Sequence, residues 1–139
     1  MDNCIFCRIV SGDIPSSKVY EDDEVLAFLD ISQATKGHTL VIPKQHVRNV
    51  LEMDEDAAST VFSRVPKIAR ALKKATGASG MNIIANNEEI AGQTVFHAHI
   101  HLVPRYGDKD GLAISYTEHE PDFEALAKLA ETIKKEISA

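Results

Sequence analysis

The sequence predicts an α+β fold with a mostly antiparallel sheet and helices on one of its faces. Three observations predict it: short runs rich in β-branched residues, short polar links between them, and two longer stretches with apolar residues at helical spacing. Because the links are too short for the crossovers that parallel strands need, neighbouring strands should pair antiparallel. The length predicts a single domain, residues 1–139, and its core should be aliphatic because the chain has no Trp.

The first third of the chain predicts three strands. Residues 5–11 are expected to form a short turn or helix. Residues 18–21 and 25–29 lie on either side of acidic residues, a pattern typical of two strands joined by a solvated hairpin turn. A third strand is predicted at residues 39–42, where a β-branched-rich run is stopped by Pro43.

The rest of the chain predicts two helices and two further strands. Residues 54–76 begin with acidic side chains suited to the positive end of a helix dipole. Pro66 lies inside this stretch and is expected to kink the helix rather than divide it. Residues 81–85 and 95–103 are the strongest strand candidates. Residues 121–137 predict the second helix, because their apolar side chains fall on one side.

Composition and charge argue against several classes of function. The net charge of −6 disfavours binding of a nucleic-acid polymer, although dipoles and neutral imidazoles can hold a small nucleotide. The chain does not open with a basic and then an apolar segment, so no signal peptide is expected. No apolar stretch approaches the roughly 20 residues that span a bilayer. The sequence therefore predicts a cytoplasmic protein that binds no membrane and keeps its two cysteines reduced.

Three histidines alternate along residues 95–103. Strand geometry would place His97, His99 and His101 on one face, about 6.6 Å apart. The side chains between them should point toward the helices; they are Phe96, Ala98, Ile100 and Leu102. Three imidazoles in a row are costly to desolvate without a purpose. Spacing alone leaves two functions open: a metal site, or phosphoryl chemistry in which a neutral imidazole attacks phosphorus.

Polar residues around this run favour phosphoryl chemistry. Gln93 and Thr94 directly precede it and place an amide and a hydroxyl beside the imidazoles. His38 opens another predicted strand, and Asn86 follows the strand expected at residues 81–85. Together these side chains supply hydrogen-bonding groups for phosphate oxygens and for a leaving group.

At residues 97–103 the His-x-His-x-His-apolar-apolar run resembles the signature of the histidine triad (HIT) family. The Gly-His-Thr-Leu-Val-Ile-Pro run at residues 37–43 and the opening Cys-Ile-Phe-Cys are similar to those of bacterial Hit members, close to the Hint branch. The resemblance covers residues 4–111, whereas the C-terminal segment at residues 112–139, with its predicted helix, matches less clearly. It implies a HIT-like fold: a five-stranded antiparallel sheet with two helices, paired in a homodimer with a ten-stranded sheet.

The resemblance also implies a reaction. His99 would attack the α-phosphate of a purine nucleoside phosphoramidate, forming a covalent nucleotidyl-histidine that water then hydrolyses. His101 would lie at the phosphate and the leaving group, and His38 near the phosphates or the other histidines. Thr94 stands where many relatives have Ser; its hydroxyl can still donate a proton, although its rotamers are more restricted. The implied substrate-binding residues are Asp30, Ile31, Asn86, Gln93, Thr94, His99 and His101.

Two other functions remain open on this sequence. The histidines equally suit a dinucleoside polyphosphate hydrolase of the Fhit type. A nucleotide-binding adaptor with incidental catalysis is an alternative from another class. The sequence has no Walker-type glycine loop and no acidic cluster suited to magnesium, so no obligatory cofactor is expected for the chemical step.

Cys4 and Cys7 have the spacing of half a tetrahedral zinc site. A thioredoxin-like redox pair is disfavoured, because no strand precedes the cysteines and no βαβ unit follows; two incidental cysteines remain an alternative. The resemblance to bacterial Hit proteins implies a structural zinc, one per chain, with His46 and His97 as the other ligands. His97 would then be unavailable for acid–base chemistry.

Overall fold

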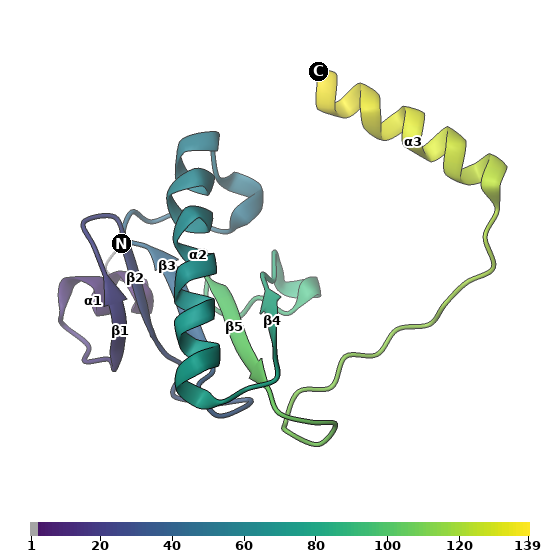
Figure 1. Cartoon of the computed structure of the whole chain (residues 1–139). Coiled ribbons are helices and arrows are strands. Elements are labelled where there is room, and N and C mark those ends of the chain that lie inside the picture. Colours follow the sequence, from purple (N-terminus) through teal and green to yellow (C-terminus); the bar gives the residue numbers. More distant parts are fainter. Residues whose placement is uncertain (1–2) are drawn as a thin grey trace.

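One five-stranded antiparallel sheet forms the centre of the structure, a computed structural model that describes residues 3–139 (Figure 1). The elements in chain order are α1 (Ile5–Ser11), β1 (Lys18–Glu21), β2 (Val25–Leu29), β3 (Thr39–Pro43), the 3-10 turn η1 (Val50–Glu52), α2 (Glu55–Thr76), β4 (Gly80–Ile84), the 3-10 turn η2 (Glu89–Ala91), β5 (Ile100–Arg105) and α3 (Phe123–Ser138). The strand order is β1-β2-β3-β5-β4, so β1 and β4 are the edges. Every neighbouring pair is antiparallel, which confirms the predicted α+β class.

The two faces of the sheet are covered by different helices. Val25 and Ala27 of β2 pack with α2, whereas Leu26 and Phe28 of the same strand pack with Phe6 of α1. The prediction that the helices share one face was therefore wrong. The physical reason lies in β2 and β3, which are apolar on both sides and so require cover on both sides.

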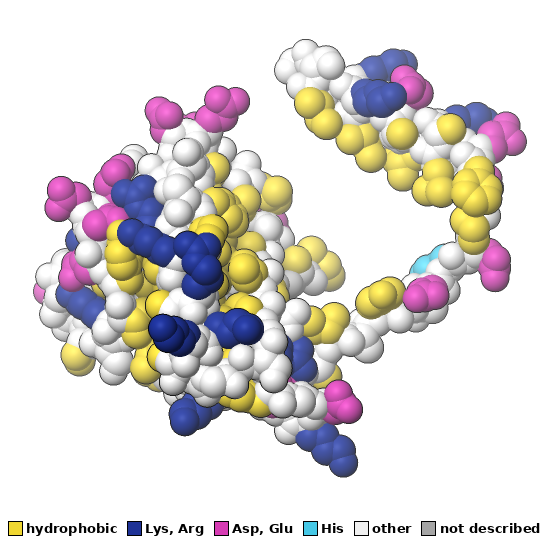
Figure 2. Space-filling model, viewed as in Figure 1, with side chains coloured by type: hydrophobic (Ala, Val, Ile, Leu, Met, Phe, Trp, Pro, Cys, Tyr) yellow, Lys and Arg dark blue, Asp and Glu magenta, His cyan; other side chains and the backbone are white. Residues whose placement is uncertain are grey.

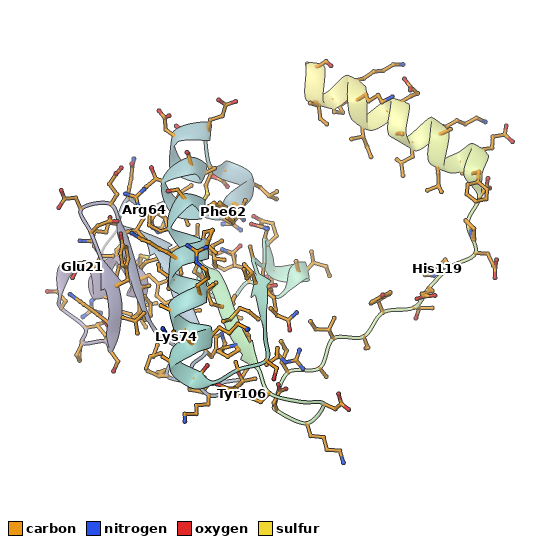
Figure 3. The ribbon with its side chains drawn as sticks, in the orientation of Figure 1. Glu21, Phe62, Arg64, Lys74, Tyr106 and His119 are labelled. Atoms are coloured by element: carbon orange, nitrogen blue, oxygen red, sulfur yellow. The ribbon has the colours of Figure 1, made fainter. Side chains whose placement is uncertain are left out.

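Helix α2 is continuous through Pro66. Its start is capped by Asp54, whose side chain accepts a hydrogen bond from the backbone N–H of Ala57. Pro66 has no N–H, so the carbonyl of Phe62 has no partner four residues along. Phe62 itself is 39% exposed (Figure 3). The helix therefore continues through Pro66 with one backbone hydrogen bond fewer.

The histidine run is only partly a strand. β5 begins at Ile100, so the prediction of a strand from residue 95 was wrong, and His97 and His99 lie in irregular backbone before it. The backbone N–H of Ala98 donates to the carbonyl of Val47 at 2.7 Å, a loop partner rather than a ladder partner. Phe96 does not face a helix either: it is 37% exposed, and its ring lies under the Arg48 guanidinium.

The C-terminal segment leaves the sheet after β5. Residues 113–122 have no regular structure and lead to α3, which stands well apart from the rest of the protein (Figure 1). The predicted helix is thus confirmed to within two residues. His119 lies on this extended stretch, far from the other histidines (Figure 3). None of the helices in the described part of the chain is long and apolar enough to cross a bilayer.

Candidate functional site

The N-terminus of α1 brings two cysteines to two histidines. The Sγ of Cys4 lies 3.3 Å from Nδ1 of His97, and the Sγ of Cys7 lies 3.4 Å from Nδ1 of His46. One donor atom from each of the four residues lies within 4.8 Å of every other. Tetrahedral zinc with ordinary Zn–S and Zn–N bonds requires S···N separations of about 3.5 Å. The two S···N separations above are close to this value, so the four side chains could hold a tetrahedral metal ion.

Hydrogen bonding fixes the tautomer of His97. Its ring is fully buried, and Nε2 lies 2.7 Å from the carbonyl oxygen of Pro43, to which the Nε2–H donates. Nδ1 therefore carries the lone pair, directed at the two thiols. Burial raises the pKa of Cys7 to about 11, helped by the Cys4 thiol. A cation among these sulfurs would offset that cost and favour the thiolate.

Three further histidines form a chain of fixed tautomers on the same side of the sheet. The backbone N–H of Ala34 donates to Nδ1 of His38 at 3.1 Å, so a neutral His38 carries its proton on Nε2. That Nε2 lies 3.0 Å from Nδ1 of His101 and donates to it. A neutral His101 then carries its own proton on Nε2. The backbone N–H of Ala34 thus determines, through His38, which nitrogen of His101 carries the proton.

His99 has the opposite tautomer. Its Nδ1 lies 2.7 Å from the carbonyl oxygen of His97, and the Nδ1–H donates to it. Nε2 of His99 is left with a lone pair, while the neighbouring ring of His101, 4.9 Å away between centroids, offers an N–H. A ring with a free lone pair and a ring with a free N–H are therefore neighbours.

Burial keeps these rings neutral. It lowers the pKa of His99, which is 8% exposed and packs edge-on against Phe6. Burial together with His99 and His38 lowers the pKa of His101 to about 4. Burial also lowers the pKa of His38, although the carboxylate of Asp30, 3.6 Å from its Nε2, acts in the other direction. Near neutral pH the imidazoles of His38, His99 and His101 are therefore uncharged.

Acid should weaken the fold through His101. Its pKa is about 4 in the folded protein and about 6.5 in an unfolded chain. Between these values the unfolded chain binds more protons, so the free energy of unfolding should fall as the pH drops from about 6.5 toward 4. Urea unfolding at pH 7 and pH 5 should show a smaller loss for His101→Asn than for the wild type. His119→Asn, in the exposed tail, is the control and should lose as much as the wild type; equal losses in all three proteins would contradict this assignment.

Asp30 and Ile31, two of the substrate-binding residues that the resemblance implies, line a cleft of about 510 Å³. Asp30 lies in its wall and also approaches His38, so it connects the cleft to the histidines. Ile31 is 99% exposed at the same cleft, an apolar side chain with no packing partner. Asn86 lies beside Gly92, where a Cβ would make an ordinary contact of 3.6 Å with the amide nitrogen; glycine is favoured there by its φ of 99°.

Gln93 and Thr94 are placed differently from the expectation. Gln93 is 2% exposed, and its amide group already hydrogen-bonds four partners: the carbonyls of Arg48 and Val95, the Asn49 side chain and the Glu88 N–H. That amide could reach a phosphate only by breaking these bonds. Thr94 is exposed and lines a cleft with Cys4 and His46, on the side of the cysteine cluster. The structure brings neither side chain into hydrogen bonding with the histidines.

Glu88 is a site residue that sequence reasoning missed. Its backbone has φ 78° and ψ 158°, a conformation that is essentially restricted to glycine and costs about 1–3 kcal/mol. Arg48 donates two hydrogen bonds of 2.8 Å to the carboxylate, and these, with a further bond from Asn49, lower the pKa of Glu88 to about 2. The ion pair fixes the loop between β4 and β5. Nothing in the sequence around Glu88 indicates that this residue has a positive φ.

Comparison with known proteins identifies the family. A model of the HIT domain matches residues 11–108, the part that contains both clusters except for the two cysteines. The chain belongs to the HIT family. The Hit protein of Bacillus subtilis is 52% identical over 99% of this chain and 97% of its own length. A crystal structure from Streptococcus mutans covers 99% of this chain and 87% of that one, with a TM-score of 0.95 and 69% identity.

Two other relatives bear on chemistry and metal. An adenosine 5'-monophosphoramidase of Schizosaccharomyces pombe is 37% identical to this HIT protein, over 97% of the chain and 98% of the relative. A zinc-bound HIT protein of Mycobacterium smegmatis is 40% identical, with a TM-score of 0.74 over 94% of this chain and 98% of the other. These similarities place the protein near the Hint branch of the family.

Proposed function

We propose that this HIT protein hydrolyses purine nucleoside phosphoramidates through a covalent nucleotidyl group on His99. The observation that carries the proposal is the pair of opposite tautomers: a lone pair on Nε2 of His99 beside an N–H on Nε2 of His101. The similarity to a phosphoramidase supports the substrate class.

The proposed reaction has two steps. In the first, Nε2 of His99 attacks the α-phosphorus, the P–N bond to the leaving amine breaks, and the amine takes up one proton. His101 is placed to hydrogen-bond the phosphate or the leaving nitrogen through its Nε2–H. In the second step water attacks phosphorus, releases the nucleoside monophosphate and one proton, and returns His99 to its neutral form. The carbonyl of His97 accepts the Nδ1–H of His99 and stabilises the positive charge that develops on the ring.

The remaining residues would hold the nucleotide. Asp30 would accept hydrogen bonds from the ribose hydroxyls, and the exposed Ile31 would pack on the base. Asn86 would donate to the phosphate. Gln93 would act by fixing the loop, since its side-chain amide is already engaged. Thr94 would contribute its hydroxyl only after a movement of the loop that carries it.

We further propose one structural zinc held by Cys4, Cys7, His46 and His97, and no cofactor in the chemical step. The donor geometry supports the zinc. A homodimer is also proposed, in which the β4 edges of two copies pair into a ten-stranded sheet. β4 is an unpaired edge and exposes Ile83, and such edges favour pairing with another strand.

Side-by-side turnover measurements test the substrate class. The expected result is hydrolysis of an adenosine phosphoramidate at a kcat/KM well above that for a dinucleoside polyphosphate, at equal enzyme and substrate concentrations. Short exposure to a chelator that leaves the fold intact by circular dichroism should not change the rate. A preference for the dinucleoside polyphosphate would indicate the Fhit-type reaction. Tight nucleotide binding without turnover of either substrate would indicate an adaptor.

A further inference from the structure

Helix α3 has an apolar face with no partner among residues 3–139 of its own chain. Its large apolar side chains are between 50% and 79% exposed; they are Phe123, Leu126, Leu129, Ile133 and Ile137. Figure 2 shows hydrophobic side chains along the side of α3 that is turned toward the body of the protein. A helix of 16 residues is marginally stable in water by itself. Its stability therefore calls for a surface that covers this face.

The detached position of α3 is shared with a solved relative. The Streptococcus mutans crystal structure superposes on 99% of this chain with a TM-score of 0.95. A score so near to 1 over almost the whole chain requires that the C-terminal helix has a similar position there. A helix on a long tether without regular structure would adopt many positions unless something held it. The shared position indicates a binding surface outside the helix's own protomer.

An apolar groove of suitable character lies between α2 and β1. It has a volume of about 380 Å³ and is lined by Val19, Tyr20, Ile68, Ala71, Leu72 and Ala75. Ala71 and Ala75 are exposed and small, so larger side chains of a second helix can enter between them. The groove also borders β1, an edge strand, and a helix placed there would cover that edge.

The charges around the groove are opposite to those that lead into α3. The half of α2 that forms the groove carries Lys67, Arg70, Lys73 and Lys74. The start of α3 and the residues just before it carry Glu118, Glu120, Asp122 and Glu124. Figure 2 shows the basic side chains gathered over α2, next to apolar ones. Such complementarity favours the approach of α3 to this surface.

We propose that α3 of each protomer docks in the α2–β1 groove of a second copy of this chain. The inference rests on the proposed homodimer, and it adds an exchange of helices to the pairing of β4 edges. Each copy gives one helix and receives one, so the contact closes on itself with two-fold symmetry. The leading acidic residues then lie near the basic end of the partner's α2.

Isotope-coded cross-linking distinguishes exchange from docking within one chain. Equal amounts of unlabelled and ¹⁵N-labelled protein are unfolded together, refolded and treated with a lysine-specific cross-linker. Cross-links between Lys67 in the groove and Lys128, Lys134 or Lys135 on α3 are then identified by mass spectrometry. The proposal expects mixed-isotope pairs as often as unmixed ones. Only unmixed pairs, or no cross-link between these two regions, would overturn it.

Two sets of variants test the surfaces by hydrogen exchange. Leu129→Gln/Ile133→Gln on the apolar face, or Ala71→Glu in the groove, should raise the exchange rate of the α3 amides at least about tenfold. Lys128→Gln/Lys135→Gln on the other face of α3 and Ser59→Glu at an exposed position of α2 are the matched controls and should keep wild-type rates. Protection that survives Ala71→Glu would refute the groove as the docking site. Neither measurement depends on turnover, so both remain valid if the proposed reaction is wrong.

Discussion

Replacement of His99 by alanine should lower phosphoramidate turnover by about 10⁵-fold or more while nucleotide affinity changes little. The expected loss is large because the variant has no lone pair in place of Nε2 of His99, the nitrogen left free by the bond from Nδ1–H to the His97 carbonyl. Removing a positioning or proton-donating group costs less, typically 10²- to 10⁴-fold. Steady-state kinetics and nucleotide titration of the same preparations measure both effects.

Chemical trapping locates the nucleophile directly. Rapid quench with a slowly hydrolysed substrate, followed by peptide mapping under alkaline conditions, should find the nucleotidyl group on His99. His119→Ala, on the exposed tail, should retain wild-type turnover and the same labelled peptide. Label on His101 or His38, or near-normal turnover in His99→Ala, would refute the mechanism.

Removal of the zinc should lower the melting temperature by about 10 °C or more, because the energy of binding a structural zinc is part of the folding energy. Cys7→Ser is the sharpest variant, since the Sγ of Cys7 lies near the Nδ1 atoms of both His46 and His97. Ser11→Ala, an exposed position at the end of the same helix, is the control and should melt like the wild type.

Metal analysis gives this prediction its second measurement. Protein purified without chelator should contain one zinc per chain. Added zinc should restore the melting temperature of chelator-treated wild type but not that of Cys7→Ser. A zinc content below about a tenth of an equivalent would contradict the site, given the tight binding expected of structural zinc.

Local patterns in the sequence were sufficient for most of the elements. The alternation of apolar and polar residues and the helical spacing depend on neighbours within a few positions, and they located α2 and four of the strands to within two residues. They failed at β5, because the backbone N–H of Ala98 is satisfied by a partner distant in sequence, the Val47 carbonyl, and not by a neighbouring strand. Tertiary contacts therefore determine where β5 begins.

The chemistry of the site likewise depends partly on the sequence and partly on the tertiary structure. The sequence by itself determined which side chains were present: three alternating histidines, a fourth at His38, and a cysteine pair with zinc spacing. Only the tertiary structure decided their protonation. The N–H of Ala34 and the carbonyls of Pro43 and His97 select the tautomer of each ring. A histidine becomes a ligand, nucleophile or donor according to the group that its other nitrogen meets, and that group is placed by the fold.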